Sequence, residues 1–153
     1  MRKILFVGAE VMPFAATGGL GDVLGSLPTA LKKEYKDDID VRVVMPLYDA
    51  VKQEWRSQMK TEAVFNLQLS WRNLYCGVLS LVKDGVTYYF IDNEYYFKRG
   101  ALYGYDDEAE RYAFFCKAAI EMLGVIGYYP DVLHAHDWQA ALKIGRASCR
   151  ERV

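Results

Sequence analysis

A glycine-rich segment near the start of the chain is the strongest candidate for chemistry. Thr17, Gly18, Gly19 and Gly21 follow a short apolar run and precede residues with helical spacing. Glycine permits positive φ angles and lets a ligand approach the backbone closely, and the free amide groups at a helix start bind phosphate. The segment therefore predicts a phosphate-binding turn, although a strand-to-helix turn without a ligand uses the same glycines. It differs from the GxGxxG pattern of dinucleotide-binding folds.

Acidic and imidazole side chains occur where predicted strands end. Glu10 follows the first apolar run, and His136 and Asp137 follow the last one. Ligand crevices in open α/β sheets lie at the carboxyl ends of the strands, so these three side chains are candidates for substrate contact. Asp22 lies one turn into the predicted helix, where a carboxylate also stabilises a helix start without any ligand. We expect His134 to point to the other side and to be structural.

Aromatic side chains are candidates for stacking on sugar rings, because the chain contains 12 Tyr and 3 Trp. The candidates are Trp71, Tyr95, Tyr96 and Trp138, and each has an alternative place in the core. Arg111, which has aromatic neighbours, is expected to be a structural ion-pair partner. No side chain is a convincing nucleophile. The 3 cysteines are widely spaced, so we expect neither a disulfide framework nor a zinc site. Neither Asp-x-Asp nor a His-rich spacing occurs, so we expect no metal site, and we expect no cofactor.

The apolar periodicity predicts an α/β fold that positions these groups. A strand–helix–strand order at the start implies a right-handed crossover and a Rossmann-like parallel sheet, and the short runs in the middle predict a β-rich excursion from it. The predicted strands cover residues 4–9, 41–46, 63–70, 76–82, 86–91 and 130–136, with a hairpin turn at 83–85. The predicted helices cover residues 21–33 and 106–123, and Asp137 is expected to cap a further one.

Length and composition limit the class of protein. A chain of 153 residues with 52% hydrophobic and 25% charged residues is typical of one soluble globular domain. The formal net charge of -1 gives no reason to expect nucleic acid or an anionic membrane as a partner. The apolar run near Met1 is too short for a signal peptide, and no stretch is long enough for a membrane helix, so we expect a cytoplasmic protein.

The last ten residues do not follow the pattern of the rest. Residues 144–153 contain three arginines and resemble the conceptual translation of a common short-read sequencing adapter. We therefore expect a partial domain over residues 1–143 and a non-native tail over 144–153. The alternative is an amphipathic helix that continues from Trp138.

Several segments, in order and at the right spacing, resemble one enzyme family. Residues 10–23 (EVMPFAATGGLGDV) are similar to the signature near the N-terminus of bacterial glycogen synthases and plant starch synthases. The resemblance continues to about Leu142. The further matching segments are 43–48 (VVMPLY), 71–73 (WRN), 89–97 (YFIDNEYYF), 102–105 (LYGY), 110–115 (ERYAFF) and 131–138 (DVLHAHDW).

This resemblance implies the N-terminal part of a glycosyltransferase with two Rossmann-like domains facing a cleft, the GT-B arrangement. Such an enzyme transfers glucose from ADP-glucose to the non-reducing end of an α-1,4-glucan with retention of configuration and without a metal. The second domain, which carries most nucleotide contacts, is not in this chain, so we expect the fragment alone to be inactive. The sequence does not distinguish ADP-glucose from UDP-glucose, and it leaves the oligomeric state open.

The resemblance also suggests roles for individual residues. Gly18 and Gly19, together with Thr17, would face the donor diphosphate, and Glu10 and Asp22 belong to the same donor region. His136 resembles the family histidine that reaches the donor sugar. The weaker candidates for the acceptor glucan are Asp137, Trp138 and Tyr95.

One position departs from the family signature. Ala16 stands where the family has a lysine before Thr-Gly-Gly, so a positive charge near the donor is missing. A charge-assisted hydrogen bond contributes about 1.5–3 kcal/mol, so the change weakens donor binding unless another cation replaces the lysine. A non-catalytic α-glucan-binding module is therefore the alternative function. A dinucleotide oxidoreductase is rejected, because GxGxxG and the acidic ribose ligand are both missing.

Overall fold

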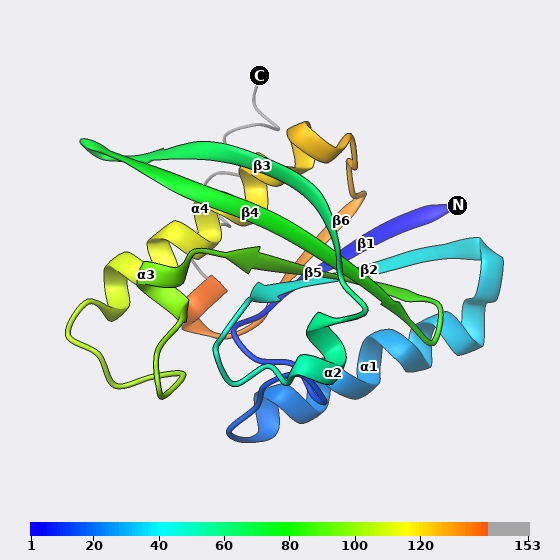
Figure 1. The fold of residues 1–153 in the computed structure, drawn as a ribbon. Coiled ribbons are helices and arrows are strands. Elements are labelled where there is room, and N and C mark those ends of the chain that lie inside the picture. Colours follow the sequence, from blue (N-terminus) through cyan, green and yellow to red (C-terminus); the bar gives the residue numbers. More distant parts are fainter. Residues whose placement is uncertain (141–153) are drawn as a thin grey trace.

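Six strands form one sheet in the order β3-β4-β5-β2-β1-β6 in the computed structural model, which describes residues 1–140 (Figure 1). The strands are β1 (Arg2–Val7), β2 (Ile39–Pro46), β3 (Lys60–Leu69), β4 (Arg72–Lys83), β5 (Val86–Asp92) and β6 (Val132–Ala135). The α-helices are α1 (Gly19–Tyr35), α2 (Gln53–Arg56), α3 (Glu94–Phe97) and α4 (Glu108–Ile126). Two 3-10 turns complete the described chain, η1 (Lys36–Asp38) and η2 (Trp138–Ala140).

The predicted parallel sheet is confirmed. β1 pairs in parallel with β2 on one side and with β6 on the other, and β2 pairs in parallel with β5. The apolar runs of β1 and β2 end in fully buried residues, among them Val7 and Val44. This burial explains their continuous rather than alternating hydrophobicity.

The β-rich excursion belongs to this same sheet rather than to a separate layer. β5 joins the parallel part, while β4 and β3 extend the sheet as antiparallel strands. The hairpin between β4 and β5 turns at Asp84 and Gly85, with φ angles of 52° and 77°. Two consecutive positive φ angles are typical of a type I′ turn, whose twist matches that of the flanking strands.

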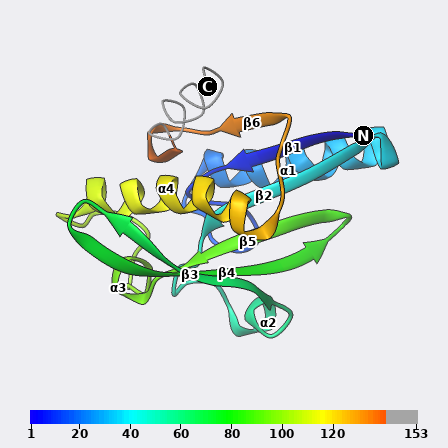
Figure 2. The same cartoon turned by 90° about the horizontal axis from the view of Figure 1, so that it is seen from above.

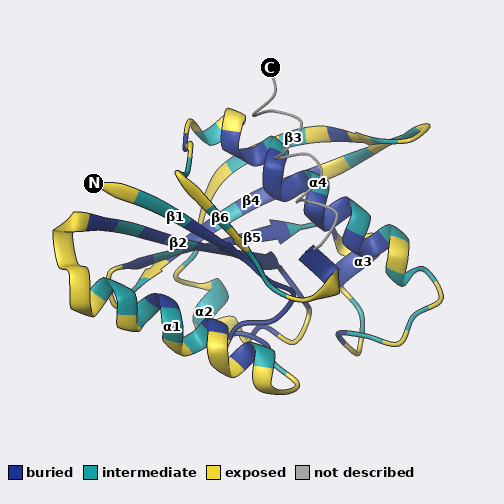
Figure 3. Cartoon of the chain, turned by 180° about the vertical axis from the view of Figure 1, so that it is seen from behind, coloured by how far each residue is buried: buried dark blue, intermediate teal, exposed yellow. Residues whose placement is uncertain are grey.

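The two long helices lie on opposite faces of the sheet, as Figures 1 and 2 show together. α1 connects β1 to β2, whereas the connection from β5 through α4 to β6 runs back across the sheet in the other direction. Right-handed crossovers in opposite directions must place their helices on opposite faces. The core therefore has two layers, and the most buried ribbon lies in the central strands and in α4 (Figure 3).

Both ends of α4 differ from the predicted helix over residues 106–123. The helix begins at Glu108, after the N-cap residue Asp107, whose carboxylate accepts hydrogen bonds from Arg99 at 2.6 and 2.8 Å and makes no side-chain capping bond. It continues to Ile126 and ends at Gly127, which has a φ of 72°. Glycine takes this left-handed conformation without steric cost, so Gly127 is suited to end the helix. The helix therefore extends past the end that the apolar pattern alone predicts.

Arg111 on α4 is fully buried and ties an irregular loop to the helix. Its Nε donates to the Tyr96 carbonyl at 2.7 Å and its Nη1 donates to the Leu102 carbonyl at 3.0 Å. The same guanidinium forms an ion pair with Glu108. The expected structural role of Arg111 is therefore confirmed.

The chain after β6 turns sharply. Asp137 has a φ of 63°, and its carboxylate accepts a hydrogen bond from the Trp138 amide at 2.7 Å. A 3-10 turn over Trp138–Ala140 follows, and any continuation of the helix expected after Asp137 lies outside the described residues. The expected tail over residues 144–153 lies outside the described residues. Among the described residues, no helix is long and apolar enough to cross a membrane.

Candidate active site at the carboxyl ends of β1 and β6

The strand order reverses direction between β1 and β6. From β1 the chain proceeds through α1 to β2, and from β5 it crosses through α4 to β6, on the other side of β1. The loops that leave these two adjacent strands diverge to opposite faces, and the crevice between them is the usual ligand site of an open α/β sheet. The predicted site residues of the glycine-rich segment and of 136–138 leave the sheet at this point.

Glu10 is a buried carboxylate that holds the glycine-rich segment in place. It is 4% exposed, and its Oε2 accepts hydrogen bonds from the Thr17 backbone amide and from the Thr17 hydroxyl, both at 2.8 Å. No lysine or arginine within residues 1–140 forms an ion pair with it. Glu10 therefore determines where Thr17, and with it the start of α1, is positioned.

A group of three tyrosines, Tyr48, Tyr103 and Tyr112, lies on one side of Glu10, and the sequence did not predict it. Burial, and then the negative charge of Glu10, raise the pKa of the Tyr103 hydroxyl, and Asp137 contributes in the same direction. The Tyr112 hydroxyl lies 2.9 Å from that of Tyr48, and burial raises the pKa of Tyr112 to about 12. These hydroxyls stay protonated at neutral pH and act as neutral hydrogen-bonding groups. Tyr103 lies in the segment 102–105, which is one of the segments that resemble the family. This segment is an irregular loop without periodicity, so the position of the Tyr103 side chain could not be predicted from the sequence.

The glycines of the loop divide into two groups by their surroundings. A Cβ atom on Gly21 would lie 2.3 Å from Ala16 Cβ, and one on Gly25 would lie 2.7 Å from the Met12 carbonyl oxygen. Gly21 and Gly25 therefore allow α1 to pack directly against the preceding loop. By contrast, a Cβ on Gly18 or Gly19 would meet nothing within 4 Å.

Gly18 and Gly19 also need no unusual backbone conformation. Gly18 has an extended φ of -171°, and neither residue has a positive φ. The prediction that these two glycines are present to allow positive φ angles is therefore wrong. Neither local packing nor backbone strain within residues 1–140 accounts for them. An open backbone at the N-terminus of a helix of 17 residues is suited to close approach by an anionic ligand.

Asp22 and Ala16 flank this open backbone. Asp22 is exposed in the first turn of α1 and forms no side-chain cap, so its carboxylate is available to solvent. The Ala16 side chain points toward Gly21 at the helix start. A longer side chain at position 16 would therefore begin beside the α1 N-terminus.

His136 is fixed at the end of β6 by its own backbone. Its amide donates to the Val7 carbonyl at 2.9 Å, which places the imidazole beside the end of β1. Trp138 follows and is 53% exposed, with one edge against the Tyr112 ring at a centroid distance of 5.4 Å. Trp138 thus presents an aromatic face to solvent beside the tyrosine group.

The prediction that His134 points away from His136 is wrong. His134 Nδ1 lies 2.6 Å from His136 Nε2, and the ring centroids are 4.4 Å apart. Successive side chains alternate across a strand, so residues two apart share a face and the two imidazoles lie on the same side of the sheet.

The other aromatic candidates lie elsewhere. Tyr96 is fully buried and belongs to the core, which was its alternative interpretation. Tyr95 is 62% exposed on α3, beneath the Arg99 guanidinium, and Trp71 is exposed at the turn between β3 and β4. No contact within the described residues joins Tyr95 or Trp71 to Glu10.

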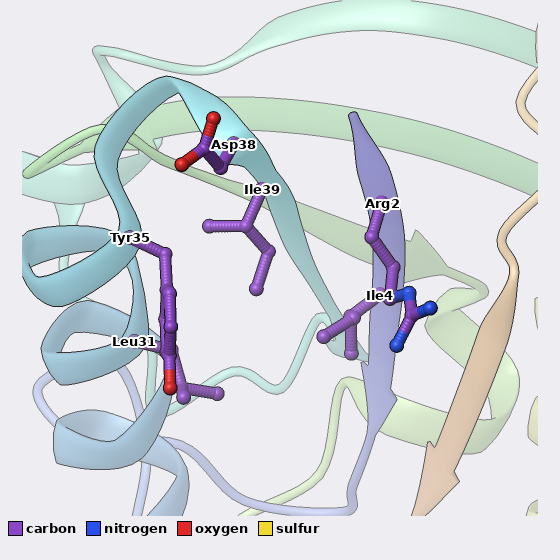
Figure 4. Close-up of a pocket in the computed structure, with 6 residues that line it drawn as sticks. All are labelled: Arg2, Ile4, Leu31, Tyr35, Asp38 and Ile39. Carbon is purple, nitrogen blue, oxygen red and sulfur yellow. The ribbon is translucent and has the colours of Figure 1, made fainter.

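A hollow at the opposite edge of the sheet does not coincide with these residues. It has a volume of 330 Å³ and lies between the C-terminal end of α1 and the start of β1 (Figure 4). Its lining consists of Arg2, Ile4, Leu31, Tyr35, Asp38 and Ile39. The amino ends of parallel strands are not the usual ligand site of this fold, and none of the predicted site residues lines this hollow.

Comparison with known proteins agrees with the geometry. The family model described as the starch synthase catalytic domain matches residues 3–148. The chain belongs to the starch synthase catalytic domain family. It is 53% identical over 139 residues to the glycogen synthase of Ligilactobacillus salivarius and 49% identical over 144 residues to that of Clostridioides difficile.

A solved structure shares the fold of this family member. The catalytic domain of starch synthase IV from Arabidopsis thaliana, bound to ADP and acarbose, has a TM-score of 0.81 at 29% identity and covers 93% of this chain. The alignments cover 91% and 92% of this chain but only 29% of either glycogen synthase, and the same share of the Arabidopsis chain. The chain thus spans less than a third of the length of these relatives.

Proposed function

We propose that this chain is the donor-side and acceptor-side half-site of a glycogen or starch synthase, whose intact form transfers glucose from ADP-glucose to the non-reducing end of an α-1,4-glucan with retention. The observation that carries this proposal is the open Gly18–Gly19 backbone at the α1 N-terminus, which follows β1. β1 pairs with β6, and His136 and Asp137 follow β6 at the strand-order reversal. Family membership supports it, and so does the ADP and acarbose bound to the Arabidopsis relative.

The open backbone supplies a site for the diphosphate. Amides of Gly18 and Gly19 would donate to phosphate oxygens, and the α1 dipole favours the negative charge there. Thr17 does not need to touch the ligand, because both its amide and its hydroxyl are already bound to Glu10. In this proposal Glu10 and Thr17 position the loop, while Asp22 lies within reach of the donor.

The residues after β6 supply the sugar end of the site. His136 would reach the donor glucose, and Asp137 with the exposed face of Trp138 would border the acceptor. A retaining reaction in this site does not require an enzyme nucleophile when the leaving phosphate guides attack on the same face, with electrostatic stabilisation as the protein's contribution. Tyr95 is exposed on α3, where it would be available to an acceptor glucan.

The missing parts of the site would come from a second α/β domain. Within residues 1–140 no lysine or arginine forms an ion pair with Glu10, Asp22 or Asp137, which supports a source outside the described residues for the charge that neutralises a diphosphate. We therefore propose that the fragment alone is inactive. We also propose that residues 144–153 are not part of the natural protein and that the intact enzyme acts in the cytoplasm.

The test is glucan elongation by the full-length protein. Radiolabelled ADP-glucose and UDP-glucose are supplied separately with glycogen, and incorporation of label is measured together with binding of maltoheptaose. We expect incorporation from ADP-glucose. Binding of maltoheptaose without incorporation from either nucleotide sugar would instead support the glucan-binding module, and neither binding nor incorporation would contradict both functions.

A further inference from the structure

Two imidazoles, those of His134 and His136, meet at the end of β6. The proposed reaction assigns no role to His134. His134 Nδ1 and His136 Nε2 are 2.6 Å apart, so one ring nitrogen donates a hydrogen bond to the lone pair of the other. His134 is exposed and His136 is half-buried. The sequence contains 2 histidines, and these are the two.

The backbone and one aromatic ring hold the pair together. In the parallel register of β1 and β6, Phe6 lies opposite His134 and Val7 opposite Ala135. Phe6 is buried, and its ring contacts both imidazoles at centroid distances of 5.1 and 5.8 Å. The hydrogen bond from the His136 amide to Val7 fixes the end of the strand. The imidazoles are therefore paired by rigid elements rather than by a mobile loop.

The side of the sheet that carries the pair is only partly covered. Phe6 and Ile4 are two residues apart in β1 and share a face, and Ile4 lines the hollow beneath α1 (Figure 4). The histidine pair thus lies on the α1 side. α1 packs on β2 and β5 rather than on β6, which leaves His134 in contact with solvent.

Two neutral imidazoles at this spacing form a chelate for a transition-metal ion. Metal–nitrogen bonds of about 2.0–2.1 Å, at ligand angles of about 90–110°, place two nitrogens about 2.8–3.4 Å apart. The observed 2.6 Å needs an opening of only a few tenths of an ångström, which small rotations of the two rings provide. The donating ring must move its proton to its other nitrogen, and this tautomer change leaves both imidazoles neutral.

We propose that His134 and His136 form a bidentate binding site for a divalent first-row transition-metal ion such as Ni²⁺, Cu²⁺ or Zn²⁺. No set of three or more potential metal ligands occurs in residues 1–140, so water completes the coordination and the metal is an exchangeable ligand rather than a structural one. Occupation of His136 Nε2 by the metal would withdraw this nitrogen from the sugar.

The test is Ni²⁺ binding by the 153-residue chain without any affinity tag. Every protein carries Cys149→Ser, so that this thiol cannot bind the metal, whereas Cys76 and Cys116 are buried. Titration calorimetry compares this protein with His134→Gln, His136→Gln and the double variant. We expect each single change to weaken binding at least tenfold, because a chelate needs both rings, and the double variant to bind little more weakly than the single ones. Equal affinity of the parent and either single variant would overturn the proposal.

A second measurement does not depend on the variants folding. Because the chain has 2 histidines, their imidazole signals can be followed directly by NMR in the unsubstituted rings as Ni²⁺ is added. Both sets of signals should broaden at the same metal concentration. Broadening of one ring alone, or of neither, would contradict a shared site. These readouts need no donor or acceptor, so they stand apart from the transferase proposal.

Discussion

At the scale of single residues, the candidate site has an excess of negative charge. Glu10 is buried and forms no ion pair within residues 1–140, while Asp22 in the first turn of α1 and Asp137 in the turn after β6 are exposed. A diphosphate adds further negative charge, which is repelled unless a cation accompanies it. Position 16, beside the α1 N-terminus, is where the family signature has that cation and this chain has Ala16.

Replacing Ala16 by lysine should therefore strengthen nucleotide binding by the full-length protein. A charge-assisted contact of about 1.5 kcal/mol or more corresponds to a gain of about tenfold in ADP affinity. Titration calorimetry with ADP measures it. Ala16→Gln is the matched control, since it adds length without charge and should leave the affinity near that of the parent. A similar gain for both variants would show that charge is not the cause.

Thr17 should contribute to stability through its bond to Glu10. Thr17→Val removes the hydroxyl that donates to the buried carboxylate, so we expect a loss of about 1–2 kcal/mol in the free energy of unfolding. Urea denaturation of the chain measures this loss. Thr17→Ser keeps the hydroxyl and should retain most of the stability. If Thr17→Val were as stable as the parent, Glu10 would not depend on this hydroxyl.

At the scale of elements, the glycines around the α1 N-terminus have separable roles. Gly25→Ala would drive a methyl group into the Met12 backbone, so we expect destabilisation of about 1–3 kcal/mol in urea denaturation. Gly19→Ala meets nothing and should leave the stability nearly unchanged. In the full-length protein, however, Gly19→Ala should weaken ADP binding. Unchanged ADP affinity in that variant would remove Gly19 from the donor site.

The buried thiol of Cys76 on strand β4 should make the stability of the fold sensitive to alkaline pH. Burial, and then the charge of Asp92, raise the pKa of the Cys76 thiol to about 12. The folded state holds this proton more tightly than the unfolded state, so stability is complete below the unfolded pKa and is lost as the pH rises from about 9 toward 12.

The alkaline loss from one such group is about 1.4 kcal/mol per pH unit within this window. Cys76→Ala should therefore lose less stability than the parent between pH 9 and pH 11, whatever its stability at pH 7. Urea denaturation at each pH measures the difference. Parallel pH profiles for the two proteins would show that Cys76 does not titrate in this range.

The elements were largely predictable because their signals are local. The apolar runs of β1 and β2 and the Asp84–Gly85 turn follow from burial and backbone preferences within a few residues. The placement of β5 inside the parallel sheet could not be predicted, because pairing between distant strands has no local signature. The tyrosine group around Glu10 has the same explanation, since Tyr48, Tyr103 and Tyr112 meet only in the folded chain. The error at His134 had a different cause, because alternation along a strand predicts its shared face with His136.

At the scale of the whole molecule, we expect the described residues to provide one wall of a cleft that a second domain completes. The site residues lie at one edge of the sheet, and the chain spans 29% of the length of the glycogen synthases it matches. The uninterrupted gene downstream of Lys143 should therefore encode a second α/β domain with a basic pair for the diphosphate. Sequencing that gene tests the expectation. A stop codon shortly after Lys143, or a downstream region without such a domain, would contradict it.

The burial of Arg111 has a consequence for how the chain meets proteases. The irregular segment between α3 and α4 contains Lys98 and Arg99, which are trypsin sites by residue type. Yet this segment is bound on both sides, through Tyr96 and Leu102 to Arg111, and through Arg99 to Asp107. A protease must draw several residues out of the fold before it can cut. Cleavage here would require breaking the hydrogen bonds from the buried Arg111 guanidinium to the Tyr96 and Leu102 carbonyls, so this loop should survive limited digestion until the domain itself unfolds.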